Sequence, residues 1–145
     1  MGDLQAPEGF YSVTKDKLNP NSRFHLSFNL GFPNALERSL GRTGSFLMIH
    51  GGCFSTGCYA MTNELMEEIY YLVEASLNSN NESFSVHSFP FKMSNHRIDK
   101  ATSHKWYSFW SNLKQGYDWF ESKSIPPEVD HDDGVYTVSY THLTL

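Results

Sequence analysis

Cysteine, positive charge and long apolar runs are all scarce in this sequence. Its two cysteines lie close together in one stretch, so they cannot make a disulfide framework and do not indicate a redox compartment. No apolar run approaches the roughly 20 residues that span a bilayer, and the first residues lack the basic start and apolar middle of a signal peptide. The net charge is −5 and the basic residues are scattered. We therefore expect no nucleic-acid partner and no membrane span in this chain.

Aromatic residues are abundant, at 15% of the 145 positions. A chain of this length is sufficient for one domain with a real hydrophobic core. The rings could fill that core or line a substrate groove, and we favour the core.

Hydrophobic periodicity indicates short strands and two longer helices. Alternation with period two, or a short apolar run, predicts strands over residues 10–13, 23–30, 45–50 and 84–89. Spacing of three and four predicts helices near residues 62–77 and 103–121, the first with Thr62 as its N-cap. The connection over residues 31–44 has the length of a binding loop. The expected fold class is α+β, a mainly antiparallel β-sheet with flanking helices.

Residues 49–61 carry the chemistry that stands out. They contain both cysteines and three of the ten glycines, with His50 at the end of an apolar strand. His50 and Cys58 can form a thiol–imidazole pair, in which the imidazole serves first as base and then as acid. A free thiol, with a pKa of about 8.5, needs such activation to act as a nucleophile. Acyl transfer through a cysteine is the reaction that this pattern favours.

Small residues before the nucleophile support the same interpretation. Gly57 lets the backbone N–H groups beside Cys58 approach an oxyanion, and Thr56 adds a hydroxyl group. The helix expected after Thr62 would modestly favour a thiolate at its positive end.

Several alternatives remain open for these residues. His50 and Cys58 could be a satisfied core histidine and a buried thiol. Zinc could bind His50, Cys53 and Cys58, although structural zinc sites usually have four ligands. Cys53 could be a packing residue, a disulfide partner of Cys58 or a second redox-sensitive thiol.

Candidate substrate-binding residues come from several parts of the chain: Tyr11, His25, Asn29, Arg42, Ser55 and Thr56. The guanidinium of Arg42 could bind a substrate carboxylate, or it could be an ordinary exposed side chain. The acidic run at residues 130–133 could bind a cation, but a solvated tail is the simpler interpretation.

The stretch from His50 to Met61 resembles the signature of the L,D-transpeptidase (YkuD-like) catalytic domain. His-Gly at a strand end is followed by Ser-Thr-Gly-Cys, with Thr56 at the position where most members have a second histidine. That departure and the shorter loop are similar to the YafK-type branch, the murein transpeptidase-related proteins. The resemblance covers residues 2–129 and includes residues 2–11, 19–22 and 28–34 and the aromatic helix from Trp106.

The resemblance implies a mechanism, a substrate and a location. Cys58 would be the nucleophile, His50 the general base, and the Gly51 carbonyl the group that orients the imidazole, while N–H groups near Gly57 and Cys58 would bind the oxyanion. The substrate would be a peptidoglycan stem peptide, attacked at the L-centre carbonyl of diaminopimelate, in the periplasm and without cofactor or metal. The branch favours hydrolysis of the peptidoglycan–lipoprotein link. Transpeptidation, as crosslinking or lipoprotein anchoring, and an inactive peptidoglycan-binding module are the alternatives.

The resemblance also suggests how the chain is organised. Residues 1–129 would be a catalytic domain that lacks its N-terminal strands, and residues 130–145 an acidic, non-native tail. Residues 138–145 resemble the translation of a sequencing adapter, and we expect them to lie outside the fold.

Overall fold

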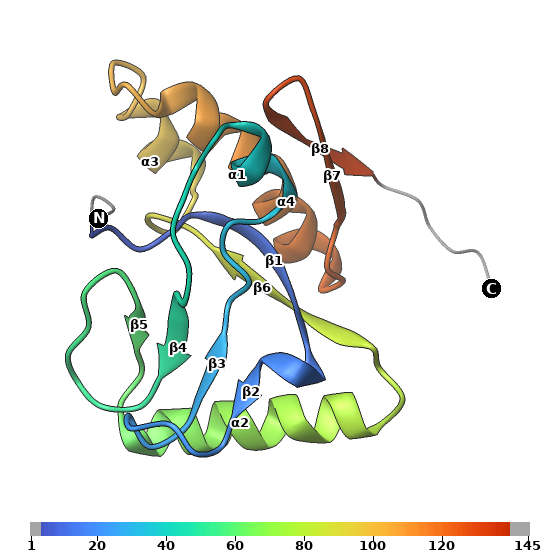
Figure 1. Ribbon diagram of the computed structural model, residues 1–145. Helices are drawn as coiled ribbons and strands as arrows, with labels where there is room; N and C mark the ends of the chain where they lie inside the picture. The colour runs from blue at the N-terminus through green and yellow to red at the C-terminus, as the bar shows by residue number, and fades with distance from the viewer. Residues whose placement is uncertain (1–3, 140–145) are drawn as a thin grey trace. The chain divides into compact units, whose positions relative to one another are not determined.

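The computed structural model describes residues 4–139 and divides the chain into two compact units, one ending at Ser88 and one beginning at Phe89. Both units mix helices with short strands (Figure 1), so the predicted α+β class is confirmed. Among the described residues, no helix combines the length and the apolar character needed to cross a bilayer.

The first unit contains two small sheets. One pairs β1 (Gly9–Thr14) with β6 (Ser83–Ser88) in antiparallel register. The other has the order β2-β3-β4-β5, with strands β2 (Leu18–Asn19), β3 (Ser27–Asn29), β4 (Met48–His50) and β5 (Tyr59–Ala60). Its pairs are antiparallel except β4 with β5, which is parallel. A 3-10 turn at Lys15–Lys17 separates β1 from β2.

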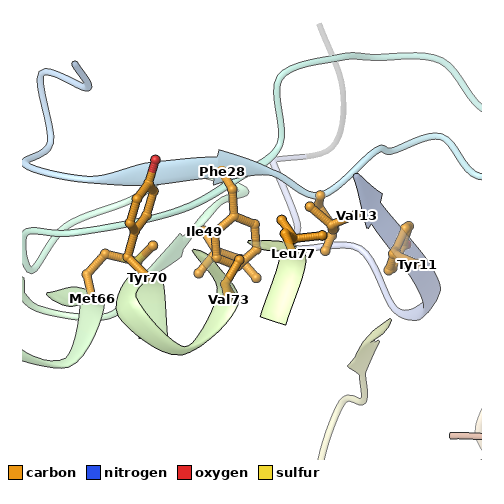
Figure 2. Close-up of a cluster of buried hydrophobic side chains, with 9 residues drawn as sticks. Tyr11, Val13, Phe28, Ile49, Met66, Tyr70, Val73 and Leu77 are labelled. Carbon is orange, nitrogen blue, oxygen red and sulfur yellow. The ribbon is translucent and has the colours of Figure 1, made fainter. Parts of the chain in front are cut away.

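Helix α2 (Asn63–Asn78) supplies one side of the core of this unit. Its buried residues recur every three or four positions and therefore share one face: Met66, Tyr70, Val73 and Leu77. They lie in one cluster with Phe28 of β3 and Ile49 of β4 (Figure 2). The predicted helix and its Thr62 cap are confirmed, because the Thr62 side chain accepts a hydrogen bond from Leu65 N. The helical spacing of Leu65, Ile69, Val73 and Leu77 predicts Leu65 in the apolar stripe, but this side chain is 49% exposed and the prediction is wrong.

The strand predicted over residues 23–30 is reduced to Ser27–Asn29. Ser22 Oγ accepts from Phe24 N, and His25 has φ +71°, so the chain turns here instead of extending. Alternation over residues 23–30 predicts Phe24 on the apolar face and Ser27 on the polar face, but Phe24 lies exposed and Ser27 is buried.

The predicted loop over residues 31–44 contains helix α1 (Ala35–Ser39). A capping box starts it: Asn34 Oδ1 accepts from Glu37 N, and the Glu37 carboxylate accepts from Asn34 N. The expectation of a connection without regular structure was therefore wrong. The strand after it begins at Met48 and not at residue 45, because Phe46 has φ +58°.

The second unit has helices α3 (Asn95–Asp99) and α4 (Tyr107–Lys123), followed by a hairpin of β7 (Glu128–Asp132) and β8 (Val135–Ser139). The helix predicted near residues 103–121 corresponds to α4. The hairpin turns at Asp133 and Gly134, both with positive φ. Asn112 of α4 binds β8 twice, since its side chain accepts from Tyr136 N and donates to Tyr136 O, both at 2.8 Å.

Residues 128–139 thus form regular structure where an ordered part ending near residue 127 was expected. Asp-Gly between two alternating segments is a hairpin signal, and it was overlooked in favour of the acidic composition. Val138 and Ser139, the first two residues of the proposed adapter-derived segment 138–145, are instead the last two of β8 and pair with β7. The rest of that segment, from position 140 onward, lies outside the described residues.

Candidate active site

Strands β4 and β5 lie side by side with the Gly-rich loop between them (Figure 1). Their parallel register pairs Ile49 with Tyr59 and His50 with Ala60. One step earlier on each strand, Met48 N donates a hydrogen bond to Cys58 Sγ at 3.3 Å. The register therefore places Cys58, which directly precedes β5, opposite Met48, two residues from His50 along the pair.

His50 is buried, with 4% of its surface exposed. Its Nδ1 lies 2.6 Å from the Gly51 carbonyl oxygen. A carbonyl oxygen only accepts, so Nδ1 carries the proton, and Nε2 of the neutral ring keeps its lone pair. The Phe24 ring lies against the imidazole, with 4.7 Å between the ring centroids. The ring is thus fixed at one nitrogen and covered by an aromatic neighbour.

Position 51 is too crowded for any residue with a side chain, so it requires glycine. A Cβ at this position would lie 2.6 Å from Phe24 O and 3.0 Å from His25 Cβ. Its own N–H donates to Leu26 O at 3.0 Å. This tight contact brings the turn at residues 24–26 against the base of the site.

The loop between the strands is mostly exposed. Cys53 is exposed and Cys58 half-buried, and both thiols are free. Ser55 Oγ donates to Cys58 O at 2.7 Å. Gly57 has φ +78°, a conformation that side chains strain to adopt, directly before Cys58. The Cys58 thiol lies 3.7 Å from Phe46 O.

Two of the predicted substrate-binding residues use their polar groups within the fold. Tyr11 is buried, and its hydroxyl donates to Glu37 Oε1 at 2.7 Å. Asn29 Oδ1 accepts from Gly31 N at 2.9 Å. Burial raises the pKa of the Glu37 carboxyl. The structure therefore places Tyr11 in the core and not in an open groove.

The other candidates are accessible. His25 lies beside Gly51, and its Nε2 is 2.7 Å from Glu67 Oε1. Ser55 and Thr56 are exposed on the loop. Arg42 is exposed three residues after the end of α1, and its charge acts on Glu37. His25 therefore lies beside Gly51, Ser55 contacts Cys58, and Thr56 lies on the same exposed loop, whereas the charge of Arg42 acts on Glu37.

Three neighbours of the site were missed in the sequence. Phe24 covers His50. Asn63 Oδ1 accepts from Gly52 N at 2.9 Å. The Tyr59 hydroxyl binds the Pro7 carbonyl and Ser88 Oγ, and burial raises the pKa of Tyr59. An asparagine directly after a helix cap was a usable signal for Asn63, whereas the turn that carries Phe24 had none.

No group of three or more histidine, cysteine, aspartate or glutamate side chains gathers within residues 4–139. The described side chains therefore give no support to zinc at His50, Cys53 and Cys58, or to a cation at residues 130–133.

Comparison with known proteins gives the family. No protein-family model matches the chain. Over 139 residues, 96% of its length, it is 44% identical to "Putative L,D-transpeptidase YafK" of Escherichia coli strain K12. The same values hold for the protein of that name from Escherichia coli O157:H7. The match covers 56% of each relative, so the chain spans about half the length of the curated relatives it matches. The chain is therefore a relative of the YafK proteins, which confirms its resemblance to the YafK-type branch of the L,D-transpeptidase family.

Proposed function

We propose that this chain is part of a cysteine-dependent acyl-transfer enzyme that acts on peptidoglycan stem peptides. Cys58 is the nucleophile and His50 the general base, and residues 1–129 form an L,D-transpeptidase-like catalytic domain. The carrying observation is the β4–β5 pair, in which a buried imidazole with a protonated Nδ1 lies two register steps from a free, half-buried thiol. The name of the relatives, L,D-transpeptidase, supports the same class of reaction.

The proposed reaction proceeds in two steps. Cys58 Sγ bonds to the diaminopimelate L-centre carbonyl carbon while its proton passes to Nε2 of His50. The C–N bond then breaks, Nε2 returns the proton to the leaving amine, and a thioester remains. Backbone N–H groups near Gly57 and Cys58 stabilise the oxyanion. Water or an amine next attacks the thioester and frees the thiol.

Two features support the assignment of roles to the loop. Gly57 has a left-handed φ that favours glycine, so no side chain lies directly before Cys58. Met48 N points to the sulfur, where an N–H donor is suited to a developing negative charge. His25, Ser55 and Thr56 are the accessible candidates for substrate contacts. Tyr11, Asn29 and Arg42 remain weaker candidates, because two bind within the fold and the third is near Glu37.

Hydrolysis of the peptidoglycan–lipoprotein link in the periplasm is our preferred outcome, on the strength of the branch resemblance. The test is to incubate lipoprotein-bearing peptidoglycan with the intact protein and with its Cys58→Ala variant. Free lipoprotein produced only by the Cys58 form supports hydrolysis. New crosslinks between diaminopimelate residues would instead assign transpeptidation.

A third possibility is a peptidoglycan-binding module without activity. It requires that Cys58 not react with a thiol-directed acylating reagent. Rapid labelling of Cys58 that is lost in His50→Ala would argue against it, and absence of labelling in both would overturn the enzymatic proposal.

A further inference from the structure

The peptide group between Gly51 and Gly52 is hydrogen-bonded at both ends. Its carbonyl oxygen accepts from His50 Nδ1 at 2.6 Å, and its N–H donates to Asn63 Oδ1 at 2.9 Å. We propose that Asn63 is a positioning residue for His50, acting through this peptide. The proposal rests on the proposed role of His50 as general base. It identifies the group that supports the imidazole where other cysteine and serine enzymes place an asparagine or aspartate directly on the ring.

The peptide is suited to transmit the effect of Asn63. The C=O and N–H of a trans peptide point in opposite directions along one conjugated unit. A hydrogen bond at the N–H end therefore fixes the direction of the carbonyl and increases the negative charge on its oxygen. That oxygen faces the Nδ1 proton, so Asn63 stabilises both the tautomer of His50 and the positive charge the ring acquires during proton transfer.

The same backbone is fixed on either side of this peptide. Met61 N donates to His50 O, and Thr62 N donates to Gly52 O, both at 2.9 Å. The Cβ of any other residue at position 51 would lie 2.8 Å from Asn63 Oδ1. The Gly51 carbonyl is therefore aimed by the segment that starts helix α2, and the amide oxygen of Asn63 provides the side-chain contact in this arrangement.

Asn63 is not the cap of helix α2. The Thr62 side chain accepts from Leu65 N and performs that function. The Asn63 oxygen contacts the peptide beneath His50 instead. Replacing Asn63 should therefore leave the helix cap in place, which separates a positioning role from a purely structural one.

The test compares Asn63→Ala and Asn63→Asp in the intact protein. Asn78→Ala is the matched control, because it removes an asparagine hydrogen bond, that of Lys15 Nζ at 2.8 Å, from the other end of α2. Three quantities are measured: kcat and KM for lipoprotein release, the thermal midpoint, and the pH dependence of Cys58 alkylation by iodoacetamide. Alkylation is measured in a Cys53→Ser background, with the label at Cys58 read by peptide mass spectrometry, and it requires no turnover.

We expect Asn63→Ala to lower kcat about tenfold, the equivalent of about 1.4 kcal/mol, with KM nearly unchanged. In this variant the rise of the Cys58 alkylation rate with pH should begin at lower pH, because the Gly51 carbonyl then stabilises the His50 imidazolium less. Asn63→Asp still offers an oxygen to Gly52 N, so it should retain most of kcat, and its negative charge should move this rise to higher pH. Asn78→Ala should leave kcat and the profile unchanged.

Two results would overturn the inference. One is a wild-type kcat and profile in Asn63→Ala. The other is a loss of kcat that follows the thermal midpoint, with no shift in the profile and no rescue by aspartate. The alkylation profile requires no turnover, so an unchanged profile in Asn63→Ala counts against the inference whatever the enzyme's substrate. If Cys58→Ala releases as much lipoprotein as wild type, the proposed function fails, while the alkylation profiles still decide the role of Asn63.

Discussion

Gly51 is the single residue on which the geometry of the site most depends. It contributes the carbonyl that binds His50, and it lies against the turn at residues 24–25 and the start of α2. We expect Gly51→Ala to lower the free energy of unfolding by about 1–3 kcal/mol, because overpacked contacts force neighbouring backbone to move. Urea denaturation measures this loss, and Cys58 alkylation should slow in the same variant.

Gly41→Ala is the matched control for that substitution. Gly41, unlike Gly51, has a positive φ of +70°, and a Cβ there meets no atom within 4 Å. Gly41→Ala should lower the free energy of unfolding by about 1 kcal/mol, from backbone strain alone, and leave the rate of Cys58 alkylation unchanged. If both variants slowed alkylation equally, crowding at position 51 would not be the cause.

Glu37 is a second residue with a consequence that can be measured. Burial raises the pKa of its carboxyl above the ordinary value of 4.5, even though Asn34 and Tyr11 donate hydrogen bonds to it. The folded state therefore binds a proton more tightly than the unfolded state. Its contribution to stability is fully present below pH 4.5 and is lost as the pH rises through the folded-state pKa.

Comparison with Glu37→Gln isolates this effect, because glutamine does not titrate and is accepted in a capping box. The stability of wild type relative to Glu37→Gln should fall as the pH is raised from 4.5 toward neutrality. Urea unfolding of both proteins across this range provides the measurement. A difference that grew with pH would mean that the folded protein favours the ionised carboxylate.

Among the elements, helix α2 links the core to the site, since its first turn binds Gly52 and its inner face packs on β3 and β4. We expect Met66→Ala to destabilise the protein by about 2–5 kcal/mol, because Met66 is fully buried. The adjacent Leu65→Ala should change stability by less than about 0.5 kcal/mol, because that side chain is half exposed. Equal losses in thermal or urea unfolding would show that both side chains are covered.

How far the elements could be predicted depends on the origin of their signal. Long-period features were readable: the α2 stripe and its Thr62 cap, the strand that became β6, and the apolar segment ending at His50. Turn chemistry decided the rest. His25 and Phe46 have positive φ, which shortened the two strands predicted there. Neither residue type indicates a positive φ from sequence. The Asn34–Glu37 capping box could have been recognised in the sequence, but the length of the connection favoured a loop. The Asp133–Gly134 turn could also have been recognised, but the acidic composition favoured a tail.

The site was predictable to a similar degree. His50, Gly51 and Cys58 were identified from a local pattern, because strand end, glycine and thiol lie close in sequence. Phe24 and Tyr59 could not be assigned, because their contacts join segments distant in the chain, and periodicity carries no information on such pairs. The burial of Tyr11 was not foreseen for the same reason, because its hydroxyl binds Glu37, which is distant in the chain.

At the scale of the whole molecule, every candidate catalytic residue belongs to the unit that ends at Ser88. The second unit has its own buried residues, including Leu113 and Tyr136, and its own clamp at Asn112. We expect Asn112→Ala to speed hydrogen exchange of the Tyr136 amide about tenfold or more, because that amide loses its acceptor. Amides of α2 should exchange at wild-type rates. Equal acceleration in α2 would show that both units open as one cooperative body.

The anchoring of the Gly-rich loop has a mechanical consequence. At its first end, Gly52 is hydrogen-bonded to Thr62 and Asn63. At its second end, Tyr59 pairs with Ile49 of β4. The Tyr59 hydroxyl also binds Pro7 O and Ser88 Oγ. Between these two anchors the span over residues 53–56 is exposed, with Phe54 at 89%. The loop is therefore held by hydrogen bonds at both ends and is exposed between them. A substitution of Phe54 should therefore leave the positions of His50 and Cys58 unchanged, because the contacts that hold them lie elsewhere.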